Sequence, residues 1–357
     1  MTPTTEQELS EIIAGSNGPL RIRGSGTRAI GRTDGADLSL ASMTGITLYE
    51  PGAMTIVAKA GTPVAEIEET LAKENQRLAF EPMDHRTVLG TQGEPTIGGV
   101  VAANVSGPRR IAVGACRDFA LGVRFVDGSG TVIKNGGRVM KNVTGYDLVK
   151  LLAGSYGTLG VLTEVSLKVL PEVETSATLT LRGLDDKTAI RALSSVLGSP
   201  FEVTGAAHLA GTTMIRIEGF EASVAYRAGK LRDLLRSFGE ATVEDADWTA
   251  IRDVRGLADQ PGDIWRISTT PSAAADLVAQ IDPKAVQYDW GGGLIWALTP
   301  EGTDLRTKLG AFDGHATLIR GKAAQTFHPE PAPLAAISQG LRAKFDPRGI
   351  LNPGLMT

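Results

Sequence analysis

The segment from Gly90 to Gly107 constrains the fold of this chain more than any other part of it. It reads Gly-Thr-Gln-Gly-Glu-Pro-Thr-Ile-Gly-Gly-Val-Val-Ala-Ala-Asn-Val-Ser-Gly. Pro95 stiffens the approach to a helix of small residues that begins at Gly98 and Gly99. The first amides of a helix lack intrahelical partners and attract anions. The segment therefore predicts a backbone site for a pyrophosphate, and a Gly-rich contact between two helices is the alternative.

A second Gly-rich loop, Arg23-Gly-Ser-Gly-Thr-Arg28, follows a predicted strand over residues 20–23. Its glycines allow several backbone amides to converge on one phosphate. Gly24, Gly26 and Ala29 also satisfy the G-x-G-x-x-A pattern of a Rossmann loop. However, residues 29–35 have the composition of a turn, whereas a Rossmann loop opens a helix with an apolar stripe. We expect a phosphate loop of another fold, with an ordinary turn as the alternative.

Composition excludes several classes of protein. The 357 residues include 36 Lys plus Arg and 40 Asp plus Glu, so a net charge of -4 offers no general attraction for nucleic acid. Cys116 is the single cysteine, which rules out an internal disulfide or a cysteine-bound metal cluster. The four histidines lack helical metal-ligand spacing, so no metal is expected. With no signal peptide or apolar span, a cytoplasmic location is expected.

Periodicity predicts the main elements. Thr5 and Glu8 have capping-box spacing before an amphipathic helix. Alternation predicts a hairpin over 121–134 and a half-buried strand over 161–169. Later segments predict a β-α-β-β-α-β order typical of a ferredoxin-like sheet: strand 176–182, helix 186–197, strands 201–209 and 213–218, helix 221–238 and strand 264–268. A final helix is predicted over 333–345.

Three further motifs complete a recognisable order. They are Gly114-Ala-Cys-Arg-Asp118, Lys141-Asn-Val-Thr-Gly-Tyr-Asp147 and Gly154-Ser-Tyr-Gly-Thr-Leu-Gly160. Together with the two Gly-rich loops and the tail 345–354, they resemble the PCMH-type FAD-binding family that includes vanillyl-alcohol oxidase. Within that family, the chain is most similar to the FAD-binding (E) subunits of bacterial glycolate oxidases. The resemblance is strong over residues 20–171 and 345–354 and covers the middle in outline.

The resemblance implies an α+β fold in three parts. Residues 1–173 would form a PCMH-type FAD-binding domain of two subdomains, 174–329 a ferredoxin-like α+β cap domain, and 330–357 a tail that returns to the FAD domain. The FAD would be noncovalent, because position 28 is Arg where relatives attach the flavin through His. A lone buried thiol such as Cys116 more often serves as a small apolar filler.

The resemblance also carries over cofactor-binding residues, one position at a time. They are Gly24, Ser25, Gly26, Thr27, Pro95, Thr96, Gly98, Gly99, Asn104, Asp118, Gly157, Thr158, Gly160, Val161 and Asn352.

The family chemistry implies a base and a cation for a 2-hydroxy acid. The His-rich cap motif of the relatives, often associated with a metal, is absent here. His315 is the candidate base and Arg320 the candidate carboxylate partner, with Arg266 as an alternative cation. A surface or interface role is the alternative for His315, and an exposed position on a strand is the alternative for Arg266.

The implied function is oxidation of glycolate to glyoxylate by hydride transfer to FAD. The implied partners are a second FAD-containing glycolate oxidase subunit and an iron-sulfur subunit, through which any attachment to the membrane would occur. One alternative is a self-sufficient FAD-dependent D-2-hydroxy-acid dehydrogenase of the D-lactate type. Another is a non-catalytic flavosubunit that relays electrons or assists assembly, and a Rossmann dehydrogenase is the most distant.

Overall fold

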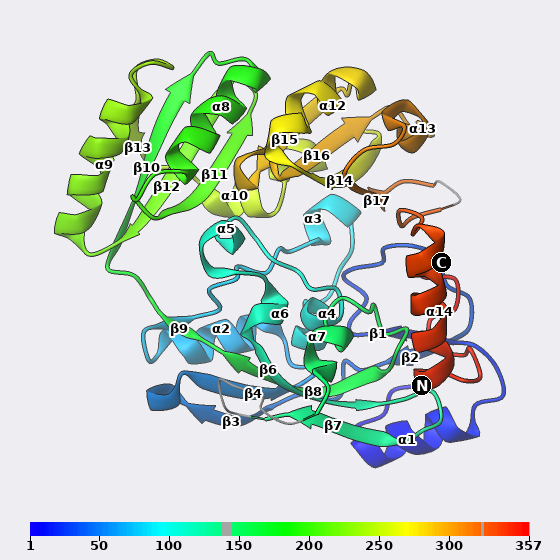
Figure 1. Cartoon of the computed structure of the whole chain (residues 1–357). Helices are drawn as coiled ribbons and strands as arrows, with labels where there is room; N and C mark the ends of the chain where they lie inside the picture. Colours follow the sequence, from blue (N-terminus) through cyan, green and yellow to red (C-terminus); the bar gives the residue numbers. More distant parts are fainter. Residues whose placement is uncertain (138–144, 323–324, 357) are drawn as a thin grey trace.

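The protein is described here by a computed structural model that covers residues 1–137, 145–322 and 325–356. The first lobe (residues 1–171) and the second lobe (residues 175–320) each contain an antiparallel sheet, of five and eight strands respectively. The second lobe lies across the first, and the C-terminal helix runs along one side of the first lobe (Figure 1). No helix in the ranges described is long and apolar enough to cross a membrane.

The five-stranded sheet of the first lobe forms its centre. In spatial order its strands are β3 (Ile46–Glu50), β4 (Thr55–Lys59), β8 (Val161–Lys168), β6 (Ala120–Val126) and β7 (Val132–Gly136). The hairpin predicted over 121–134 is present as β6 and β7. The strand predicted as half-buried is instead buried on both faces, because α4 and the N-terminal helix pack on opposite sides of β8.

Short helices surround this sheet. They are α1 (Glu6–Gly15), η1 (Pro51–Ala53), α2 (Val64–Ala72), α3 (Arg86–Leu89), α4 (Ile97–Ala102), α5 (Arg110–Val113), α6 (Cys116–Phe119) and α7 (Leu148–Leu152). The capping box of α1 is confirmed, since Glu8 N donates to Thr5 Oγ1 at 3.2 Å. Two small sheets complete the lobe: parallel β1 (Leu20–Arg23) with β2 (Ala36–Ser39), and β5 (Gln76–Arg77) with β9 (Leu170–Pro171).

The second lobe contains two β-α-β-β-α-β units side by side. The first comprises β10 (Thr175–Arg182), α8 (Asp186–Leu197), β11 (Val203–Leu209), β12 (Thr212–Gly219), α9 (Glu221–Leu235) and β13 (Thr242–Glu244). The second comprises β14 (Asp263–Thr269), α12 (Ala274–Ile281), β15 (Ala285–Asp289), β16 (Leu294–Thr299), α13 (Leu305–Leu309) and β17 (Gly314–Arg320). Between or within them lie α10 (Trp248–Arg252), α11 (Arg255–Ala258), η2 (Pro271–Ala273) and η3 (Trp290–Gly292).

The predicted ferredoxin-like unit is corrected in one respect. Its fourth strand is Thr242–Glu244, whereas the strand predicted over 264–268 begins the second unit. Strand β11 pairs with β15 through His208 and Tyr288, which joins the two units into the order β13-β10-β12-β11-β15-β16-β14-β17. The three-residue β13 is too short to produce a visible alternation in the sequence.

The two lobes pack through a shared apolar core and a buried ionic network. Phe80 and Val88 of the first lobe belong to one apolar cluster with Leu298 and Ile319 of the second. Beside it, Arg109 Nη2 lies 2.7 Å from Glu218 Oε1, and Arg216 Nη1 lies 2.9 Å from Glu81 Oε1. Each pair joins one lobe to the other, so the sheet of the second lobe is held at a fixed distance above the first.

The chain returns to the first lobe at its end. Helix α14 (Ala332–Phe345) is followed by Leu351, which bridges to Leu20 of β1. Arg348 donates to the carbonyl of Gly128 in the β6–β7 turn at 2.7 Å. The tail therefore contacts the first lobe. The division into domains 1–173, 174–329 and 330–357 stays a prediction.

Candidate functional site

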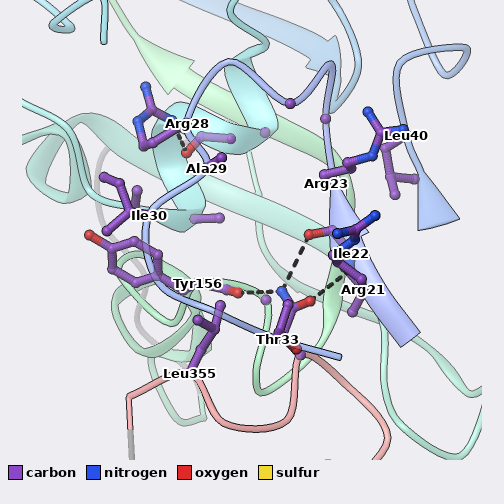
Figure 2. A pocket seen from close by; sticks show the side chains of 18 of the residues that line it. Arg21, Ile22, Arg23, Arg28, Ala29, Ile30, Thr33, Leu40, Tyr156 and Leu355 are labelled. Atoms are coloured by element: carbon purple, nitrogen blue, oxygen red, sulfur yellow. Dashed lines mark hydrogen bonds between the residues drawn. The ribbon is translucent and has the colours of Figure 1, made fainter. Parts of the chain in front are cut away.

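A cavity of about 600 Å³ lies in the first lobe. It is lined by residues 21–34, by parts of 96–103 and 156–162, and by Asn352 and Leu355 of the tail. Figure 2 shows Arg28, Ile30 and Tyr156 toward one end, and Arg21, Arg23 and Leu40 toward the other. The cavity is within the size range of cofactor sites in proteins.

The loop after β1 supplies unpaired backbone donors to this cavity. Within the described chain, the amides of residues 25–29 donate no hydrogen bond to another residue. The loop is fixed instead through its carbonyls, with Ser39 Oγ donating to Gly24 O at 2.9 Å and Thr91 Oγ1 to Thr27 O at 2.8 Å. No helix follows the loop before residue 36, so the Rossmann alternative is excluded.

The start of α4 contributes less than the sequence suggests. Ile97 N donates to Thr62 O at 3.0 Å and Gly98 N to Ala60 O at 2.8 Å, so these two amides are not available to an anion. Only the Gly99 amide remains among the first three. Gly98 is instead required for close packing, because a Cβ there would lie 2.6 Å from Ala60 Cβ. The donors for a pyrophosphate therefore come mainly from the loop of residues 25–29.

The structure brings most of the predicted cofactor residues together. Those that line the first cavity are Gly24, Ser25, Gly26, Thr27, Thr96, Gly98, Gly99, Gly157, Gly160, Val161 and Asn352. Asn104 lines a neighbouring cavity instead. Pro95, Asp118 and Thr158 line neither. Positions 141–144, in the motif from Lys141 to Asp147, lie outside the described residues.

The three residues away from the cavities have structural contacts that explain their positions. Pro95 O accepts from Val64 N at the start of α2. Asp118 accepts from Ala115 N at 2.8 Å and so caps α6. Thr158 Oγ1 donates to Ser155 O at 2.7 Å within the last Gly-rich loop. These residues shape the surrounding backbone without lining the cavity.

Asn352 holds three separate segments at the cavity wall. Its Oδ1 accepts from Ile22 N at 2.6 Å, and its Nδ2 donates to Tyr156 O at 2.8 Å. The side chain therefore ties β1 to the loop around Tyr156 from the returning tail. Asn352 tolerates the left-handed backbone it adopts, with φ +45.

A second cavity of about 490 Å³ adjoins the first, between the two lobes. Arg28, Ile30, Ala103 and Tyr156 line both, so the two spaces share a wall. The second lobe contributes mainly the face of its sheet around β14 and β17, through Arg266, Ser268, Trp296, His315 and Thr317.

Arg28 and His85 form a buried basic pair between the cavities. Arg28 Nη1 donates to Gly99 O at 2.8 Å, and its Nε lies 3.3 Å from His85 Nδ1. Burial and the Arg28 charge keep the pKa of His85 well below its usual value, so this imidazole stays neutral. Sequence reasoning did not single out either residue as part of the site, although Arg28 is the last residue of the Gly-rich loop after β1.

The two predicted catalytic residues have different surroundings. His315 lies at the exposed rim of the second cavity, where partial burial and then the charges of Arg266, His328 and Arg110 lower its pKa. Arg320 lines neither cavity, and its role as carboxylate partner stays a prediction. Its guanidinium donates to the carbonyls of Gly262, Val88, Ala258 and Gln260. Those bonds fasten β17 to α3 and α11 and leave no free donor fork for a carboxylate.

The residues present fit FAD. The unpaired amides of residues 25–29 are donors that a pyrophosphate requires. Gly24 leaves a space that a side chain would fill, because a Cβ there would lie 2.1 Å from Thr96 Oγ1. Cys116 lines neither cavity, and burial raises the pKa of its thiol to about 12, so it is not a reactive thiolate toward a flavin.

Comparison with known proteins decides the family. A family model described as an FAD binding domain matches residues 1–136. The chain is 37% identical over 355 residues to glycolate oxidase subunit GlcE of Escherichia coli (strain K12), covering 98% of this chain and 95% of that protein. The chain belongs to the GlcE family. FAD is its cofactor, and the expected relation to FAD-binding glycolate oxidase subunits is confirmed.

Two further comparisons concern a second glycolate oxidase subunit and the fold. The chain is 29% identical over 227 residues to glycolate oxidase subunit GlcD of Bacillus subtilis (strain 168), covering 62% of this chain and 47% of that protein. A solved structure of alkyldihydroxyacetonephosphate synthase aligns with a TM-score of 0.69 at 16% identity, covering 99% of this chain and 76% of that one. The latter likeness concerns the fold alone, and it confirms the predicted PCMH-type α+β architecture.

Proposed function

We propose that this chain is the FAD-binding subunit of a glycolate oxidase complex that oxidises glycolate to glyoxylate and passes the electrons to partner subunits. The observation that carries the proposal is the junction of the two cavities. The cavity that fits FAD opens beside a second one that contains a neutral histidine at its rim and the guanidinium groups of Arg110 and Arg266. A small 2-hydroxy acid needs a base for its hydroxyl and a cation for its carboxylate.

The reaction assigns one task to His315. Bound FAD would supply an acceptor for the hydride that leaves the α-carbon with two electrons. His315 would accept the hydroxyl proton as the C–H bond breaks and the C=O bond of glyoxylate forms. Its lowered pKa keeps the imidazole unprotonated, and therefore ready to accept that proton, near neutral pH.

The electrons must leave through other proteins. Both GlcE and GlcD are named as subunits of glycolate oxidase, which supports an assembly of several chains. With Cys116 as its one cysteine, this chain cannot provide the thiolates of an iron-sulfur cluster. An iron-sulfur partner that accepts electrons from the reduced subunit is therefore part of the proposal, together with a GlcD-like second flavin subunit.

The test is the visible absorption spectrum of the FAD-reconstituted chain before and after anaerobic glycolate. We expect a flavin spectrum, release of the flavin by acid precipitation, and bleaching on addition of glycolate. A flavin that dithionite reduces but glycolate leaves oxidised would move the oxidation to a partner and overturn the catalytic part of the proposal. Failure to bind FAD at all would overturn the whole.

A further inference from the structure

Arg110 and Arg266 in the second cavity lack a carboxylate partner. Within residues 1–137, 145–322 and 325–356, neither guanidinium takes part in an ion pair, and neither donates a side-chain hydrogen bond. By contrast, Arg28, in the same cavity, already donates to the Gly99 carbonyl. Two arginines without acceptors at one cavity wall are uncommon, because an unpaired buried charge is costly.

Both arginines pack against the indole ring of Trp290. The guanidinium carbon of Arg110 lies 4.6 Å from the ring centroid of Trp290, and that of Arg266 lies 5.3 Å from it. The indole is held from behind, since its Nε1 donates to Gly107 O at 3.0 Å. Cation–π attraction compensates part of the charge and fixes the direction of each planar fork.

The sheet register explains why Arg266 faces the cavity. On β14, Arg266 pairs with Trp296 of β16 and Thr317 of β17, and all three line the second cavity. Its chain neighbour Trp265 points to the opposite face, into the core beneath the outer helices. Arg110 approaches from the first lobe, at the start of α5. The pair therefore spans the junction between the lobes.

The two cations act on each other and on the rim of the cavity. Burial first, and then the charge of Arg110, lower the pKa of Arg266 to about 10. Both arginines also lower the pKa of His315. The charge of Asp289 opposes this lowering of the pKa of Arg266, while the Oδ1 of Asp289 accepts from Trp290 N at 2.7 Å. An anion placed between the two guanidinium groups would relieve this repulsion.

From this geometry we propose that Arg110, Trp290 and Arg266 form an anion clamp that binds the carboxylate of the substrate across the two lobes. This inference rests on the proposed function for the identity of the substrate, a 2-hydroxy acid. The clamp replaces the role first assigned to Arg320. A planar guanidinium can donate two parallel hydrogen bonds to a carboxylate, which suits each arginine of the clamp to this ligand.

The probe is oxalate, a dicarboxylate that cannot lose a hydride, titrated into FAD-loaded protein at constant ionic strength. Binding is followed by the change in the visible flavin spectrum. We expect Arg266→Gln and Arg110→Gln each to weaken oxalate binding about 100-fold, because each removes a charge-assisted pair. We expect Arg266→Lys to recover only part of the loss, since an ammonium cannot reproduce the bidentate fork.

Arg191→Gln is the matched control. Arg191 lies exposed on α8, in the same lobe as Arg266. Its replacement removes the same charge far from the cavity and should leave oxalate binding unchanged. Thermal unfolding and the FAD content identify any variant that fails to fold. If a glutamine variant does not fold, oxalate binding by Arg266→Lys is compared with that of the natural chain instead.

Two outcomes would overturn the clamp. One is oxalate binding within twofold of the natural chain in both glutamine variants, and the other is absence of oxalate binding in the natural chain. Failure of the proposed function is distinguishable from these outcomes. A chain that binds oxalate through Arg110 and Arg266 but is not reduced by glycolate would keep the clamp and lose glycolate as the substrate.

Discussion

Two uncharged residues, Gly24 and Asn352, shape the wall of the first cavity. Gly24 allows the loop after β1 to contact Thr96, and Asn352 connects β1, the Tyr156 loop and the tail. Sequence motifs indicated both residues as cofactor-binding, and both line the first cavity. Each supports the wall against which the cofactor would lie.

Gly24→Ala should weaken FAD binding. The added Cβ would lie 2.1 Å from Thr96 Oγ1, so the loop must move away from α4 and take its donor amides with it. We expect the dissociation constant of FAD to rise by about tenfold or more, measured by the quenching of flavin fluorescence. Gly18→Ala is the control, because nothing lies within 4 Å of a Cβ at that position. Equal FAD affinity in Gly24→Ala and the natural chain would contradict this expectation.

Asn352→Ala should lower the free energy of unfolding by about 1–3 kcal/mol, because Ile22 N and Tyr156 O each lose a partner. Asn352→Asp keeps the acceptor for Ile22 N and tolerates the left-handed backbone, so its loss should be smaller. Denaturant unfolding of the apo chain measures both variants. A loss in Asn352→Asp that matches Asn352→Ala would show that the Ile22 bond contributes little.

At the scale of elements, strand β12 carries the ionic contact between the lobes. Glu218 accepts from Arg109 Nε at 2.8 Å and lies 3.2 Å from Arg77 Nη1. Alternation along the chain predicted this strand and its neighbours, because one face of each packs under helices. Arg109 and Arg77 lie 109 and 141 residues away from Glu218 in sequence, and no local pattern indicates either contact.

Glu218 should make the stability of the protein depend on acidic pH. Burial opposes its charge, but the hydrogen bond from Arg109 and the charge of Arg216 prevail and lower its pKa from 4.5 to about 2. A carboxylate whose folded pKa is depressed stabilises the protein above pH 4.5, and that contribution is lost as the pH falls toward 2. The loss should amount to about 3 kcal/mol in the free energy of unfolding.

Denaturant unfolding between pH 2 and 6 checks this. Glu218→Gln should flatten the dependence in that window, whereas Glu202→Gln, at an exposed glutamate, should keep it. An unchanged slope in Glu218→Gln would assign the acid sensitivity to other carboxylates.

At the scale of the whole molecule, the second cavity exists because two lobes distant in sequence pack together. His85 and Arg110 enter it from one lobe, and Arg266 and His315 from the other. The charges of Arg266 and Arg110, one from each lobe, lower the pKa of His315, so the basicity of this residue depends on the packing of the two lobes.

His315→Gln should slow the reduction of the flavin by glycolate about 100-fold, since it removes the proton acceptor. The oxidised flavin spectrum and the affinity for oxalate should stay close to those of the natural chain. Anaerobic stopped-flow absorbance measures the rate. His208→Gln is unsuitable as a control because His208 is buried, so an exposed Gln7→Ala change serves instead. Reduction of His315→Gln at the natural rate would remove this residue from the reaction.

The pH dependence of flavin reduction by glycolate should reflect the pKa of His315, which its charged neighbours lower. Partial burial and the charges of Arg266, His328 and Arg110 place its pKa below 6.5, so the rate should fall only in acid below that value. In Arg266→Gln, one positive charge is lost, and the acid limb of kcat/KM should move to higher pH. If the acid limb of kcat/KM in Arg266→Gln stays where it is in the natural chain, a group other than His315 controls the rate in acid.

The sequence by itself determined the local structure, the cofactor class and most of the lining of the first cavity. Capping residues, alternation and glycine loops act over a few neighbours, so their consequences can be predicted from short segments. Tertiary structure alone decided that Arg320 binds backbone carbonyls, that Arg266 faces a cavity, and that a second β-α-β-β-α-β unit follows the first. Those outcomes depend on strand register and on the packing of lobes, which are set by contacts between residues far apart in the chain.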